Sequence, residues 1–263
     1  MSPLEVTGLV AAGTLAGLVS TVASVASLVS YPVLLAIGLP PLAANVTNTV
    51  ALLFTGVGAA AGSRPELTGQ RARLLRLGPA CLLGGAAGAA VLLLTPASWF
   101  GYAAPVLIAA GSVILLIPRP AARTPDPAAD PVTGEAAPSW VLCTAAAGVA
   151  CYIGYFGAAG GILMLALLAG VQAGPLPRAN AAKNVLNGLA NAAAAVAFAW
   201  FGPVDWAVVP PLAAGFLAGG AVGPAVVRRM PVPLLRAGVA AVGLVIAIKL
   251  GAAAYGHAAA PSR

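Results

Sequence analysis

The chain is 263 residues long, and 60% of its residues are hydrophobic while only 7% are charged. Soluble domains carry roughly 25% charged residues, so this composition excludes a soluble enzyme, a disordered chain and a nucleic-acid-binding protein. The formal net charge of +7 is typical of a membrane protein with basic cytoplasmic loops. The three cysteines lie inside apolar stretches, and we expect no disulfide framework, no metal site and no cofactor.

Apolar stretches follow one another along the whole chain. A helical stretch of about 20 residues can cross a hydrocarbon core about 30 Å thick, and the apolar runs are continuous rather than alternating, which favours helices over strands. In chain order the stretches are Leu4–Leu39, Leu42–Gly62, Leu74–Thr95, Gly101–Ile117, Trp140–Val171, Arg178–Phe201, Trp206–Val227 and Val232–Tyr255. We therefore predict an all-α polytopic membrane protein.

A polar segment divides the chain into two halves of nearly equal length. Residues 118–139 are rich in proline, alanine and acidic residues and show no periodicity, a composition typical of flexible linkers. We predict a first membrane repeat over residues 1–117, a flexible cytoplasmic linker over 118–139 and a second membrane repeat over 140–263.

The two halves share a short motif. Gly38 and Pro41 of the first half match Gly174 and Pro177 of the second half at one common offset. Each motif follows a short apolar run and opens a longer one. Many secondary transporters are built from such internal repeats, so we expect the two halves to be structurally related.

Two of the stretches are too long for a single crossing. A helix as long as Leu4–Leu39 or Trp140–Val171 would measure roughly 50 Å, well beyond the bilayer core. We expect non-helical or sharply bent backbone over Ser24–Ser30 and Gly154–Gly161, because breaks at membrane depth are tolerated where backbone lines a cavity or is buried in protein. The residues assigned to these breaks are Ser24, Ser27, Gly157, Gly160 and Gly161.

The distribution of basic residues predicts the topology. If both broken stretches enter and leave on one side, the loops after residues 62, 117, 171 and 227 share a side. That side then carries eleven of the 13 basic residues, namely Arg64, Arg71, Arg73, Arg76, Arg119, Arg123, Arg178, Lys183, Arg228, Arg229 and Arg236. The positive-inside rule favours this arrangement. It predicts two inverted repeats, each a broken helix pair plus three transmembrane helices, with both termini outside.

A stripe of asparagines marks the stretch Arg178–Phe201. Asn180, Asn184, Asn187 and Asn191 are spaced by 4, 3 and 4 residues, so all four project from one face of a helix. Lys183 borders the same face. One alternative is that these amides only join helices by hydrogen bonds, and that Lys183 extends to the membrane interface.

The matching stretch of the first half carries Asn45, Thr47, Asn48 and Thr49. Glu5 lies at the outer end of the first stretch, and no other Asp, Glu or His falls inside a predicted crossing, so there is no candidate proton relay, cation site or catalytic triad. The remaining groups are amides, one ammonium and the ends of broken helices. Helix N-termini present free N–H groups and partial positive charge, so the predicted site suits a small anion.

Two linked motifs resemble those of the TauE/SafE (sulfite exporter) family of bacterial membrane permeases. The first is YPVLLAIGLPPLAANVTN at residues 31–48, and the second is GYFGAAGGI at residues 154–162 followed by RANAAKNV at residues 178–185. The family's first half usually has a glycine-rich break, which here reads SVASLVS at residues 24–30. The resemblance implies a multi-pass inner-membrane transporter of small sulfur-containing anions such as sulfite or organosulfonates, and it covers nearly the whole chain.

We expect the anion to bind between the two repeats. The expected substrate-binding residues are Asn45, Thr47, Asn48, Asn180, Lys183, Asn184, Asn187, Tyr31 and Tyr155. Lys183 would balance the anion's charge, while Arg178 is a competing cation at the cytoplasmic mouth. The alternative function is a non-transporting structural or assembly protein of the membrane. The expected partners are the anion and the lipid bilayer, without nucleic acid, and the sequence leaves open whether the chain forms a homo-oligomer.

Overall fold

The computed structural model describes residues 2–23, 25–116, 139–171, 176–227, 240–241 and 243–252, and these residues form an all-helical membrane fold. The labelled helices are α1 (Pro3–Ala23), α2 (Ser27–Ala36), α3 (Pro41–Gly62), α4 (Arg64–Leu67), α5 (Arg71–Leu94), α6 (Ala97–Leu116), α7 (Ser139–Tyr155), α8 (Gly160–Val171), α9 (Leu176–Phe201) and α10 (Val209–Val227). A further apolar helix covers Gly243–Ala252. Helices α1, α3, α5, α6, α9 and α10 are long and apolar enough to cross a membrane.

Both long apolar stretches are broken, as the sequence predicts. The first break separates α1 from α2, and the second separates α7 from α8. The breaks are shorter than predicted, because Ser27–Ser30 already form the first turn of α2 and Gly160 begins α8. Ser24 lies outside the described residues, as do residues 118–138 of the predicted linker.

Glycine produces the break after α7. The N–H groups of Phe156 and Gly157 both donate to the Tyr152 carbonyl, at 3.0 and 3.1 Å. Gly157 has φ +72°, the left-handed conformation in which glycine commonly ends a helix. The chain can therefore turn within four residues and start α8.

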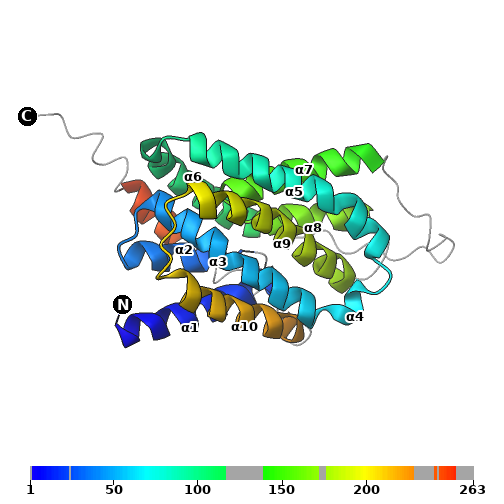
Figure 1. Cartoon of the computed structure of the whole chain (residues 1–263), viewed down its shortest axis with the longest axis horizontal. Helices are drawn as coiled ribbons and strands as arrows, with labels where there is room; N and C mark the ends of the chain where they lie inside the picture. The colour runs from blue at the N-terminus through cyan, green and yellow to red at the C-terminus, as the bar shows by residue number, and fades with distance from the viewer. Residues whose placement is uncertain are drawn as a thin grey trace, which may run out of the picture.

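Each broken pair returns to the end of the molecule where it began. In Figure 1 the start of α1 lies at the left end, and α4, which follows α3, lies at the right end. Helix α3 spans these ends, so α2 has brought the chain back to the left before α3 starts. At 10 residues, α2 is roughly 15 Å long, which is about half of the hydrocarbon core.

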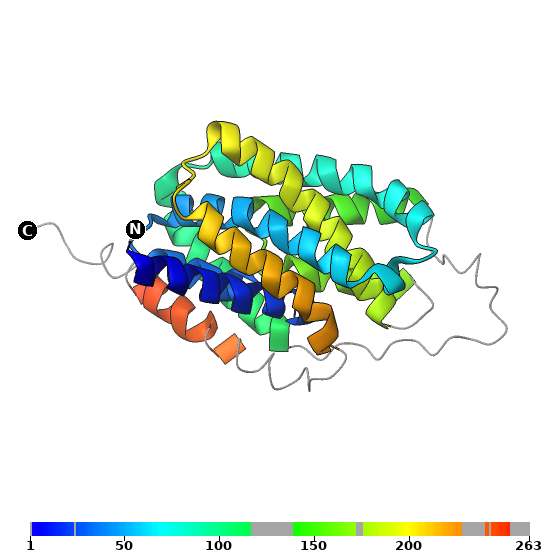
Figure 2. The ribbon, with the colours of Figure 1, turned by 60° about the horizontal axis from the view of Figure 1, so that its bottom comes forward.

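The helices form two groups with the same pattern of neighbours. Helix α10 packs against α1 and α3, while α5 packs against α7 and α9; Figure 2 shows α10 lying along α1. Helices α3 and α9 also pack against each other. Exchanging α1 for α7, α3 for α9 and α10 for α5 leaves this pattern unchanged.

Glycines allow the closest of these contacts. A Cβ at Gly17 of α1 would lie 2.8 Å from the Phe216 carbonyl oxygen of α10, and a Cβ at Gly56 of α3 would lie 2.9 Å from the Gly188 Cα of α9. Small residues let membrane helices approach closely and gain van der Waals contact. The contact between α3 and α9 therefore holds the two groups together at the centre.

Candidate functional site

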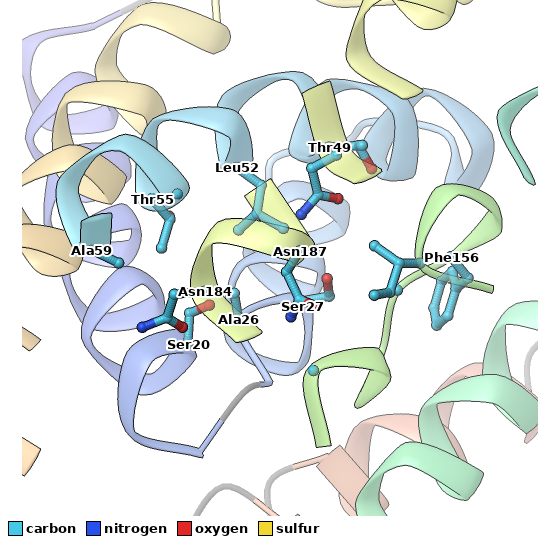
Figure 3. A pocket seen from close by; sticks show the side chains of 15 residues that line it. Ser20, Ala26, Ser27, Thr49, Leu52, Thr55, Ala59, Phe156, Asn184 and Asn187 are labelled. Carbon is cyan, nitrogen blue, oxygen red and sulfur yellow. The ribbon is translucent and has the colours of Figure 1, made fainter. Parts of the chain in front are cut away.

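The two breaks meet at one cavity. Its empty volume is about 570 Å³, including its mouth, and the surrounding side chains are shown in Figure 3. The lining residues are Ser20, Ala26, Ser27, Thr49, Leu52, Thr55, Gly56, Ala59, Ile153, Phe156, Gly157, Gly161, Asn184, Asn187 and Asn191. They come from α1, α2, α3, α7, α8 and α9 and from both breaks, and they include no acidic or basic side chain.

Two helix N-termini border this cavity. Ser27 is the first residue of α2, and Gly161 is the second residue of α8; both line the cavity. Most of the first N–H groups of α2 and α8 donate to carbonyls just before each helix, such as those of Ala26 and Ala159. The aligned peptide dipoles still add partial positive charge at these helix starts. Two such ends at one cavity make a site that favours an anion.

Three members of the asparagine stripe line the cavity. They are Asn184, Asn187 and Asn191 of α9, and Figure 3 shows Asn184 and Asn187 around the same space as Thr49 and Thr55 of α3. Asn184 is only 6% exposed, and its Nδ2 has no hydrogen-bond partner among the described residues. A buried amide without a partner is costly, so this donor is available to a ligand.

The hydroxyl of Thr55 is a second such group. Thr55 is 5% exposed, and its Oγ1 has no partner within the described part of the chain. The Thr49 hydroxyl, by contrast, donates to the Asn45 carbonyl at 2.9 Å, so only the unpartnered groups are free to donate to a ligand. Amides and hydroxyls of this kind can solvate a small oxyanion without an ion pair.

The other predicted residues of α9 lie behind the cavity. Asn180 Nδ2 donates to the Thr21 carbonyl at 3.1 Å, and Lys183 Nζ donates to the Ser20 carbonyl at 3.5 Å. Lys183 is 1% exposed, so its ammonium does not extend to the membrane surface. Both carbonyls belong to the C-terminal end of α1, where a positive group is favoured by the helix dipole.

On α3, Asn45 and Asn48 also bind protein groups. Asn45 Nδ2 donates to the Tyr155 carbonyl at 3.1 Å, which is the last residue of α7. Asn48 Nδ2 donates to the Ser27 hydroxyl at 3.4 Å, so Asn48 reaches the cavity through Ser27. Thr47 lies elsewhere, because its hydroxyl accepts a hydrogen bond from the Asp205 N–H at 2.9 Å, after α9.

The two predicted tyrosines belong to an aromatic cluster beside the cavity. The ring of Tyr31 meets Phe156 edge-on at a centroid distance of 5.7 Å, and Tyr155 meets Phe100 at 6.2 Å. Tyr31 is 1% exposed and lines a separate, largely apolar hollow with Pro41. Neither tyrosine lines the cavity, and both remain predictions as ligands.

The remaining predicted groups divide between the cavity and its surroundings. Ser27, Gly157 and Gly161 line the cavity, whereas Gly160 begins α8 beside it. Arg178 lies at the loop before α5, where its Nη2 donates to the Thr68 carbonyl at 2.8 Å. It belongs to the first turn of α9 and does not line the cavity, and its place at the cytoplasmic mouth stays a prediction.

Sequence reasoning missed Ser20 and Thr55 as lining residues, and it left Asn191 of the stripe out of the site. Asn191 carried a usable signal, because it continues the 4, 3, 4 spacing of the stripe. Thr55 lies seven residues after Asn48, which places it two turns along the same face of α3. Ser20 gave no comparable signal, since its position depends on where α1 ends.

One comparison with known proteins is informative. Residues 9–250 match the model of the family described as Sulfite exporter TauE/SafE. No curated protein and no solved structure gives a match. The matched range includes both breaks, the cavity and every labelled helix from α2 to α10.

Proposed function

Because the chain belongs to the sulfite exporter TauE/SafE family, we propose that it exports sulfite or an organosulfonate-type anion across the inner membrane of a bacterium. This is a family of membrane transporters and not of enzymes. The anion binds in the central cavity, between two repeats of inverted topology. Its oxygens accept hydrogen bonds from the amides of Asn184 and Asn187. The dipoles of α2 and α8 add partial positive charge at their starts.

An unpartnered amide and two positive helix ends at one cavity carry this proposal. Asn184 Nδ2 and the starts of α2 and α8 border one buried cavity that is lined by no charged side chain. Dipoles and hydrogen bonds stabilise the negative charge of an anion in such a site. The anion is therefore released faster than it would be from a buried ion pair. Amides with a purely structural role would instead donate hydrogen bonds to other helices, as those of Asn45 and Asn180 do.

Transport uses no carboxylate of the cavity. The lining contains no Asp or Glu, so a proton relay through a buried acid is not part of the proposed mechanism. Facilitated movement, exchange, or a proton carried by the substrate itself are the mechanisms that remain.

Sulfite flux into proteoliposomes tests the proposal. Asn184→Leu removes a donor to an anion, and hydrogen bonds to charged groups contribute about 1.5–3 kcal/mol; we therefore expect the apparent sulfite affinity to fall roughly tenfold to hundredfold. The control is Thr144→Val, because Thr144 is exposed and bonds only within its helix, to the Val141 carbonyl. Sulfite transport at wild-type affinity by Asn184→Leu would refute the site, and absence of sulfite and sulfonate flux in the wild-type protein would refute the function.

A further inference from the structure

The carbonyl ends of both broken helices are capped by side chains. The last four carbonyls of a helix have no partner within the helix, and at membrane depth water cannot replace that partner. At the end of α7 the Tyr155 carbonyl accepts from Asn45 Nδ2 at 3.1 Å. At the end of α1 the Thr21 carbonyl accepts from Asn180 Nδ2 at 3.1 Å, and the Ser20 carbonyl accepts from Lys183 Nζ at 3.5 Å.

Both caps cross from one half of the chain to the other. Asn45 is on α3 of the first half and caps α7 of the second half, while Asn180 and Lys183 are on α9 of the second half and cap α1 of the first. The caps also cross between the two groups of neighbouring helices, because α3 and α1 share the neighbour α10 whereas α9 and α7 share the neighbour α5.

We propose that Asn45, Asn180 and Lys183 are positioning residues that hold each broken helix in place from the opposite half of the chain. The capped ends lead directly into the cavity, since Ser20 lies on α1 and Phe156 follows Tyr155, and both line it. The caps therefore fix the starts of α2 and α8, where the anion is proposed to bind. In this respect the inference rests on the proposed function.

This role accounts for the positions of the side chains better than direct contact with the anion. None of the three residues lines the cavity, and each donates to a main-chain carbonyl of the other half. The ammonium of Lys183 at the end of α1 also compensates the negative end of the helix dipole. A substitution should therefore loosen one break and leave the other intact.

Hydrogen exchange of the full-length protein in nanodiscs measures this without any substrate. Asn45→Leu should accelerate amide exchange in the last turn of α7 and the first turn of α8, roughly three- to tenfold, as expected for loss of one interhelical hydrogen bond. It should leave the end of α1 unchanged. Asn180→Leu should have the converse effect, accelerating exchange at the end of α1 and leaving α7 unchanged.

Two comparisons separate this role from general loosening of the fold. Asn187→Leu, two turns along α9 from Asn180, removes a cavity amide and should leave exchange at both breaks unchanged. The conservative variants Asn45→Gln and Asn180→Gln, which keep an amide donor, should restore most of the protection. If Asn45→Leu does not fold, Asn180→Leu tests the same proposal, because Asn180 is only partly buried.

Exchange that rises at both breaks, rises in the same half as the substitution, or stays at the wild-type level would overturn the proposal. Sulfite binding is measured in parallel on the same proteins. A protein that shows the crossed exchange pattern but binds no sulfite would contradict the proposed substrate and leave the positioning role standing. Unchanged exchange together with a large loss of sulfite affinity in Asn45→Leu would instead identify Asn45 as a direct ligand.

Discussion

Asparagines on one face of α9 serve two different purposes. Asn184 and Asn187 line the cavity, whereas Asn180 donates to the Thr21 carbonyl of α1. The spacing of the stripe predicted the shared face, because helical periodicity is a local property. It could not predict the division of roles, since Thr21 is separated from Asn180 by 159 positions along the chain. The Thr21 carbonyl is free to accept this hydrogen bond because α1 ends there.

At the same scale, Lys183→Ala should impair transport more than Arg178→Ala. Lys183 is 1% exposed and lies behind the cavity wall at Ser20, so its removal leaves a buried helix end without its positive partner. Arg178 is only partly buried at the loop before α5, where water can replace its contact. We expect roughly a tenfold or larger loss of flux for Lys183→Ala and less than about threefold for Arg178→Ala.

Sulfite flux in proteoliposomes, normalised to folded protein, measures both effects. Lys183→Arg keeps the positive charge and should retain more activity than Lys183→Ala. Wild-type rate and affinity in correctly folded Lys183→Ala would show that this buried cation neither balances the anion nor positions the site.

The two broken helix pairs show what local sequence can predict about an element. Excess length over the bilayer predicted both breaks, and the glycines of residues 154–161 located the second one within a few residues. The first break was harder to place, because serines are compatible with a helix and Ser27–Ser30 form the first turn of α2. The short helix α4 had no apolar pattern and was not predicted.

Glycine contacts between elements predict which positions tolerate a side chain. A Cβ at Gly17 would lie 2.8 Å from the Phe216 carbonyl oxygen of α10, whereas Gly8, also on α1, has nothing within 4 Å of an added Cβ. Gly17→Leu must therefore separate α1 from α10, and overpacking of this kind costs about 1–3 kcal/mol. We expect its melting temperature in detergent to fall by roughly 3–10 °C.

Gly8→Leu is the matched control and should melt within about 2 °C of the wild-type protein, because its side chain enters open space. The corresponding pair on α7 is Gly154→Leu against Gly148→Leu: a Cβ at Gly154 would collide with Gly85 of α5, while Gly148 is unobstructed. Equal melting temperatures within either pair would contradict the close packing of these helices.

At the scale of the whole molecule, the arrangement of helices supports two related repeats. The pairing of α1 with α10 corresponds to that of α7 with α5, and α3 packs against α9 between them. The shared motif at Pro41 and Pro177 predicted a repeat, and both prolines lie in the first turn of the corresponding helices α3 and α9. The contacts between the repeats could not be predicted, because they depend on glycines and every long helix of the described residues carries at least one.

The orientation in the membrane is the last prediction. Arg64, Arg71, Arg73 and Arg76 lie on α4 and the start of α5, at the end of the molecule opposite to the start of α1 (Figure 1). Basic residues are retained on the cytoplasmic side, so this end should face the cytoplasm. The start of α1 and the turn between α5 and α6 should then face outside.

Single cysteines introduced into a protein with Cys81, Cys143 and Cys151 replaced by serine test this orientation. Arg71 and Ser98 are both exposed. Arg71 begins α5, and Ser98 lies in the first turn of α6, just beyond the other end of α5. A membrane-impermeant maleimide added to intact cells should label Ser98→Cys and leave Arg71→Cys unlabelled until the membrane is permeabilised. Because both broken pairs return to the end where they start, a cysteine placed after Ala252 should be labelled like Ser98→Cys. Labelling of the C-terminal cysteine only after permeabilisation would mean that one broken stretch crosses the membrane once, and the two halves would then not be inverted repeats.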